Sequence, residues 1–68
     1  MRMQITFNGE PATVPDGSTI ADLLEQQELS GKGLAVAVDG SVAVPSQWAT
    51  TTIPEGAELE VLRPMQGG

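Results

Sequence analysis

The sequence contains no cysteine and no histidine among its 68 residues. Without cysteine there is no disulfide, no thiolate-bound metal or iron–sulfur cluster and no thiol nucleophile. Without histidine the chain lacks the commonest general base and metal ligand of proteins. A domain of this size also has little room for a deep active-site cleft. We therefore expect neither an independent enzyme nor a bound metal or cofactor.

Basic residues are scarce: three against nine acidic residues, a formal net charge of −6. Nucleic-acid binding is disfavoured, because that kind of interface needs a basic surface. Long apolar runs are also missing, so we expect no signal peptide and no membrane helix, and we expect a cytoplasmic protein. The acids are dispersed, which favours solubility and is compatible with steering towards a basic partner.

The first half of the chain carries a hairpin signal. Residues 3–7 alternate apolar and polar side chains, which is typical of a half-buried strand. Asn8-Gly9 is a strong signal for a two-residue turn, and residues 12–14 return as a short second strand. Pro11 and Pro15 suit an edge of the sheet rather than its centre.

A helix is predicted over about residues 19–29. Thr19 is a good N-cap, and Asp22 follows three residues later as in a capping box. Gly31 and Gly33 offer a C-terminal stop. The apolar stripe of this helix falls at the i, i+3, i+4 spacing, on Ile20, Leu23 and Leu24.

The second half carries another hairpin and a last strand. Residues 34–38 are continuously apolar, which is typical of a central strand buried on both faces. Asp39-Gly40 turns the chain into residues 41–44. Residues 51–53 are compatible with a brief edge strand, and residues 58–62 alternate again with Leu59 and Val61 directed to the core.

The predicted order is β-β-α-β-β-β, in a single α+β domain. One helix covers only one face, so the simplest closed arrangement packs it across a mixed sheet of four to five strands. The first and last strands then lie parallel in the middle, as in the β-grasp or ubiquitin-like fold. Residues 1–63 form the domain, and residues 64–68 are a flexible tail that leaves from a central strand.

The tail ends in Gly67-Gly68. Two residues without a Cβ give a thin backbone that can enter a narrow channel. The α-carboxylate at its end is ionised at neutral pH. This is the one group of the chain that looks presented for chemistry, for example activation by ATP as an acyl-adenylate. The plain alternative is a frayed terminus without a function.

Several motifs resemble the ThiS family of sulfur carriers in thiamine biosynthesis over essentially the whole chain. The most specific stretches are Val44-Pro45-Ser46-Gln47-Trp48-Ala49 and the alternating strand that leads to Gln66-Gly67-Gly68. Family members often carry an Arg directly after the proline, where this chain has Ser46, and Arg63-Pro64-Met65 is bulkier than the usual tail. Trp48 is interpreted as a packing residue.

The resemblance implies a protein cosubstrate. A ThiF-type activating enzyme, using ATP and magnesium, would adenylate the Gly68 carboxylate. A persulfide from a cysteine desulfurase would convert it to a thiocarboxylate, and a ThiG-type thiazole synthase would accept the sulfur. Gly67 would share the catalytic assignment with Gly68.

Further residues near the tail are candidates for partner binding. Leu62 points away from the core in strict alternation and, with Pro64 and Met65, would form an apolar docking patch. Gln66 would lie in the partner's channel. Glu58 and Glu60 share one strand face, which we interpret as a solvated surface that meets a basic partner, because nothing suggests the dry pocket that a catalytic acid pair needs.

Three other functions remain open at this point. Sulfur carriers for molybdopterin or another product share the fold and the Gly-Gly end. A ubiquitin-like binding module would have a tail without chemistry. A protein modifier that forms an isopeptide bond is a further alternative.

Overall fold

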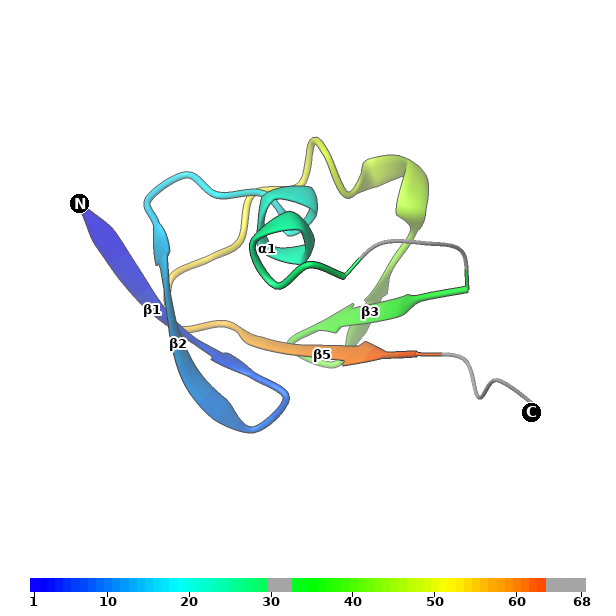
Figure 1. Ribbon diagram of the computed structural model, residues 1–68, viewed down its shortest axis with the longest axis horizontal. Helices are drawn as coiled ribbons and strands as arrows, with labels where there is room; N and C mark the ends of the chain where they lie inside the picture. Colours follow the sequence, from blue (N-terminus) through cyan, green and yellow to red (C-terminus); the bar gives the residue numbers. More distant parts are fainter. Residues whose placement is uncertain (30–32, 64–68) are drawn as a thin grey trace.

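The computed structural model describes residues 1–29 and 33–63, and residues 30–32 and 64–68 lie outside the described part. A five-stranded mixed sheet has the order β2-β1-β5-β3-β4, and one helix packs on one face of it (Figure 1). The elements are β1 (Arg2–Phe7), β2 (Glu10–Pro15), α1 (Ile20–Gln26), β3 (Ala35–Val38), β4 (Ser41–Ala43), the 3₁₀ turn η1 (Pro45–Gln47) and β5 (Glu58–Leu62). This architecture confirms the predicted β-grasp fold, with β1 and β5 parallel in the middle.

The β1–β2 hairpin turns where the sequence predicts it. Asn8 and Gly9 both have positive φ, 50° and 82°. A two-residue turn of this hand matches the twist of the strands, and asparagine and glycine tolerate it best. β2 lies at the edge of the sheet, where Pro11 and Pro15 remove N–H groups that would attract another strand.

The predicted capping box begins the helix. The Thr19 Oγ1 accepts a hydrogen bond from the Asp22 N–H at 3.1 Å, and the Asp22 carboxylate accepts one from the Thr19 N–H at 3.0 Å. Two N–H groups that the first turn leaves free are thereby satisfied. The apolar stripe of Ile20, Leu23 and Leu24 is buried against the sheet.

The helix ends earlier than predicted, at Gln26 rather than near residue 29. Glu28 takes a left-handed conformation with φ of 57°. Its N–H donates to the Glu25 carbonyl, and the Leu29 N–H donates to the Leu24 carbonyl at 2.8 Å. This pair of bonds is a Schellman motif, which normally uses glycine at the left-handed position. The predicted stop at Gly33 therefore comes too late, and Gly31 lies outside the described residues.

Replacing Glu28 by glycine is expected to raise stability by about 1 kcal/mol, since a side chain in the left-handed region is strained. The melting temperature of a domain of this size would rise by about 4–8 °C. Glu25→Gly is the matched control, because the same change inside the helix should lower stability by about 1 kcal/mol. Calorimetry that compares the melting temperatures of both variants with that of the unmodified protein tests this prediction. A loss of stability in Glu28→Gly would contradict the cap assignment.

β3 is not buried on both faces, which corrects the expectation for residues 34–38. Val36 is buried, whereas Ala35 is exposed and Ala37 is half-buried. Helix α1 and the connection from η1 to β5 lie on the same side of the sheet (Figure 1). Nothing in the described chain covers the other side of β3, so the apolar side chains on that side, Ala35 and Ala37, face the solvent.

The expected edge strand at residues 51–53 is also wrong. Only an isolated bridge between Thr19 and Thr52 forms there. The Ile20 N–H donates to the Thr51 carbonyl at 3.1 Å, and the Ile53 N–H donates to the Ser18 carbonyl at 2.9 Å. The segment's hydrogen bonds therefore tie it to the start of the helix rather than to the sheet, while Ile53 enters the core.

The core lies between α1 and the inner face of the sheet. Its most fully buried side chains are Val14, Ile20, Leu23, Val36, Ile53 and Leu59. Trp48 is half-buried against this cluster, and its indole N–H donates to the Ala43 carbonyl at 3.0 Å. The packing assignment of Trp48 is thereby confirmed.

Candidate functional site

The candidate site is the end of β5 and the chain that follows it. β5 is the central strand: its start pairs parallel with β1, through Thr6 and Phe7, and residues 59–62 pair antiparallel with β3. The last antiparallel pair joins Leu62 to Ala35. The chain therefore leaves the sheet from its middle strand, and Arg63 and the tail follow directly after β5.

Two turn residues add side-chain hydrogen bonds to the two ends of β5. At its start, the Asp39 carboxylate accepts from the Glu58 N–H at 2.9 Å. At its end, the Asn8 Oδ1 accepts from the Val61 N–H at 2.8 Å, and the Asn8 amide group donates to the Val61 carbonyl at 3.4 Å. Residues from both hairpins thus hold the strand that leads to the tail.

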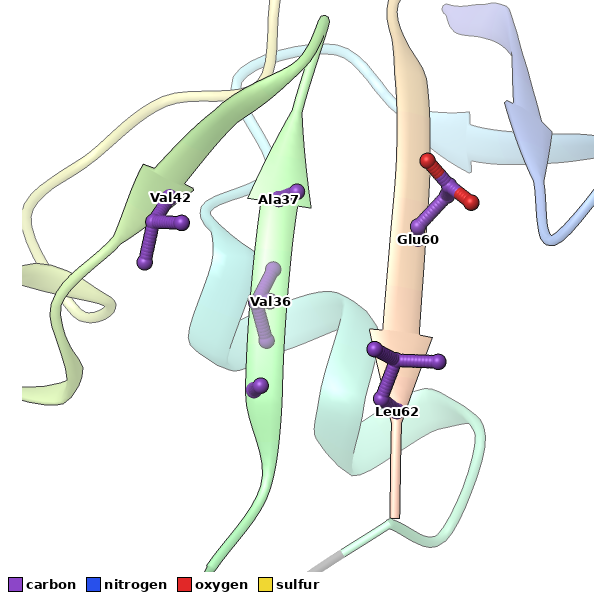
Figure 2. A pocket seen from close by; sticks show the side chains of 6 residues that line it. Val36, Ala37, Val42, Glu60 and Leu62 are labelled. Carbon is purple, nitrogen blue, oxygen red and sulfur yellow. The ribbon is translucent and has the colours of Figure 1, made fainter.

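The outer face of the sheet carries an apolar surface beside this strand. Leu62 and Val42 are 66% and 78% exposed. With Ala35, Ala37 and Glu60 they line an open hollow of about 130 Å³ over β4, β3 and β5 (Figure 2). Figure 2 shows Leu62 and Glu60 projecting from β5 on the side of the sheet away from the helix. We call Ala35, Ala37, Val42 and Leu62 the outer-face patch.

Glu58 and Glu60 are both exposed on this same outer face. They line a second open hollow of about 190 Å³ between β5 and the end of β1. Both hollows are open to water, which agrees with a solvated acidic surface and not with a dry acid pair. Among residues 1–29 and 33–63, no group of histidine, cysteine or acidic residues is placed to hold a metal ion.

The structure brings together only part of the predicted site. Leu62, Glu58 and Glu60 lie on one face, as strict alternation along β5 predicts. The remaining predicted residues lie outside the described part: Pro64, Met65, Gln66, Gly67 and Gly68. The assignment of residues 64–68 as a flexible tail stays a prediction.

The other members of the outer-face patch, Ala35, Ala37 and Val42, were not predicted from the sequence. Val42 lies opposite Ala37 because the two-residue turn at Asp39-Gly40 fixes the register of β3 and β4. That register was available from the sequence. The register was not used, because residues 34–38 were expected to be buried on both faces.

Within the described chain, no helix is long and apolar enough to cross a membrane.

Comparisons with known proteins agree with the fold and the motifs. The family model described as "ThiS family" matches residues 5–68. The sulfur carrier protein ThiS of Escherichia coli strain K12 is 30% identical over 66 residues, which cover 97% of this chain and 100% of that protein. The crystal structure of the thiamine biosynthesis protein ThiS from Geobacter metallireducens has a TM-score of 0.78 and 29% identity, and covers 97% of this chain and 100% of its own. The chain belongs to the ThiS family.

Proposed function

We propose that this protein is a sulfur carrier for thiamine biosynthesis that carries sulfur as a thiocarboxylate on Gly68. The observation that supports this most is the extent of the family match, which runs to residue 68 and so includes Gly67-Gly68. The relative in Escherichia coli is named a sulfur carrier protein. The position of β5 adds a physical reason, because a central strand gives the tail a rigid base.

In the proposed cycle the chain contributes one reacting group. A ThiF-type enzyme, with ATP and magnesium, joins the Gly68 carboxylate to AMP and releases pyrophosphate. The terminal sulfur of a persulfide, supplied by a cysteine desulfurase, then displaces AMP and forms an acyl disulfide, and a thiol reductant cleaves its S–S bond to leave the thiocarboxylate. A ThiG-type thiazole synthase takes this sulfur into the thiazole ring. The chain acts as a cosubstrate and needs no catalytic base, metal or nucleotide of its own.

The outer face is the surface that we propose for docking these enzymes. Leu62 is a large exposed hydrophobe at the last position of β5, next to the tail. A partner that receives the tail must also approach this face. Glu58 and Glu60 lie beside the outer-face patch, so a partner surface with apolar and basic residues would complement it. Pro64, Met65 and Gln66 would continue the contact into the partner's channel.

Intact-mass spectrometry after incubation with a ThiF-type enzyme, ATP and a sulfide source tests the function. We expect a mass gain that matches the exchange of one oxygen for one sulfur, located at Gly68 by fragmentation. The activating enzyme must load its own carrier in a parallel reaction. An unchanged mass under those conditions would contradict the sulfur-carrier proposal and favour a binding module.

Leu62→Ala is expected to raise the KM of loading about tenfold, because truncating a central apolar contact typically costs 1–2 kcal/mol of binding. Its free energy of unfolding should change by no more than about 0.5 kcal/mol, since the side chain is exposed. Thr13→Ala, an exposed change on β2, is the control and should leave KM unchanged. Equal KM values for Leu62→Ala and the unmodified protein would place docking on another face.

A further inference from the structure

Asn8 makes contacts that its role as a turn residue does not require. Its positive φ serves the β1–β2 turn, but its side chain reaches across to β5, 53 positions later in the chain. There its Oδ1 accepts a hydrogen bond from the Val61 N–H at 2.8 Å, and its Nδ2 donates one to the Val61 carbonyl at 3.4 Å. Its own N–H donates to the Leu59 carbonyl at 2.8 Å.

These bonds extend the hydrogen-bond ladder between β1 and β5 beyond the point where the backbone of β1 can continue it. β1 pairs with β5 only as far as Phe7 and Leu59, because the chain then turns away into the hairpin. The N–H and C=O of one strand residue point to the same side of that strand. The backbone N–H and C=O of Val61 therefore point to the side of β5 where β1 no longer runs. The side-chain amide of Asn8 binds both groups there, as the peptide group of a neighbouring strand would.

We propose that Asn8 is a positioning residue for the tail: its amide ties the β1 side of β5 at Val61, where otherwise only the pairing with β3 would hold the strand, and so helps to set where the rigid strand ends. This inference rests on the proposed function, in which the carboxylate of Gly68 must reach a partner's active site. With β5 held, the six residues 63–68 span at most about 20 Å from the sheet. A frayed β5 end would add residues to the segment that a partner must order on each binding event.

Asp39 supplies a closely matched control. Like Asn8, it has φ of 50°, opens a two-residue turn before a glycine, and accepts a hydrogen bond from a β5 N–H. It does so at Glu58, at the end of β5 away from the tail. Asn8→Gly and Asp39→Gly each keep a residue that tolerates positive φ, and each removes one side-chain clamp from β5.

Hydrogen exchange measured by NMR tests the clamp without any partner. The readout is the exchange rate of the Val61 amide relative to that of Ile53, whose N–H is bonded to Ser18 far from the tail. The ratio cancels changes in global stability, which affect both amides. We expect Asn8→Gly to raise this ratio about tenfold or more and Asp39→Gly to leave it unchanged. An unchanged ratio in Asn8→Gly would overturn the clamp.

Loading kinetics test the positioning role. We expect Asn8→Gly to raise the KM for a ThiF-type enzyme about fivefold to tenfold and to leave kcat within about twofold. The reason is that the free energy needed to order the end of β5 is spent when the enzyme binds the chain, and not in the chemical step. Asp39→Gly should keep both parameters. Asn8→Asp retains the acceptor for the Val61 N–H, so it should restore KM to within about threefold and most of the Val61 protection.

The possible outcomes separate the clamp from the function. If Asn8→Gly loosens Val61 but loads with an unchanged KM, the positioning role is wrong. If Asp39→Gly raises KM as much, the effect is general destabilisation and the positioning role is again wrong. Failure of the unmodified chain to load, with an activator that loads its own carrier, would overturn the proposed function and the positioning role with it, while the exchange result still decides the clamp.

Discussion

Deletion of Gly68 is expected to abolish sulfur loading while the fold stays intact. The deletion moves the terminal carboxylate back by one residue, about 3.3–3.6 Å of extended chain. Misplacing a reacting group by 1 Å can cost about a hundredfold in rate, so we expect the loading rate to fall by at least that factor. Intact-mass spectrometry after incubation with a ThiF-type enzyme, ATP and sulfide measures this loss directly.

Two further variants show whether the position of the carboxylate is the cause. Adding one phenylalanine after Gly68 should block loading as completely, because the side chain obstructs a channel suited to glycine. Gln66→Ala keeps the length of the chain and loses only one side-chain contact with the partner's channel, so its loading rate should stay within about tenfold of that of the unmodified protein. All three should unfold at the same urea concentration, since the core is built within residues 1–63. Normal loading of the shortened or the extended chain would eliminate the terminal-carboxylate mechanism.

Leu59→Ala is expected to have the largest effect on stability. Leu59 is 1% exposed and lies on the central strand, where it packs in the core between sheet and helix. Truncation of a buried leucine costs about 2–5 kcal/mol through lost transfer energy and the cavity left behind. The core of a domain this small rarely supplies more than about 3–5 kcal/mol of net stability. Most molecules of this variant should therefore be unfolded at 37 °C, as circular dichroism would reveal.

Leu62→Ala is the control for this stability prediction, because it makes the same change three positions later on the opposite face of β5. The two variants should separate the two faces of the strand: Leu59→Ala loses the fold, and Leu62→Ala keeps the fold but docks weakly. Equal losses of stability from both would contradict the assignment of Leu62 to an open face.

Local sequence signals predicted most of this fold. Asn8-Gly9 and Asp39-Gly40 place both hairpins, because few residues accept the positive φ that such turns need. Thr19 and Asp22 mark the start of the helix, because their side chains satisfy its first N–H groups. The alternation along β5 separates its core face from its outer face. Each signal acts within a few residues, so one sequence is enough to detect it.

Other features depend on contacts that the local sequence does not contain. Residues 51–53 have strand-forming side chains, but their hydrogen bonds go to Ser18 and Ile20 at the start of the helix. The stop of the helix at Gln26 is local, but it was also not predicted, because Glu28 occupies the left-handed position that glycine would normally take. The bonds from Asn8 to Val61 join positions 53 apart, and only the tertiary fold brings them together.

The candidate site divides in the same way. Family motifs predict Gly67 and Gly68 as the reacting end of the chain, and alternation places Leu62, Glu58 and Glu60 on one face. Ala35, Ala37 and Val42 were missed, because an apolar run of small residues reads as a buried strand. The single predicted helix covers only one face of the sheet, so the outer side of this strand has no cover.

The parallel pair of β1 and β5 also has a consequence for synthesis. β5 leaves the ribosome after every other strand, yet it fills the gap between β1 and β3. A nascent chain that stops before Glu58 has two separate hairpins, and isolated hairpins are marginally stable in water. Folding must therefore wait for the last strand and proceed slowly through contacts between distant parts of the chain. Only a chain translated through β5 can present a tail, so unfinished chains would not compete for the activating enzyme that we propose as a partner.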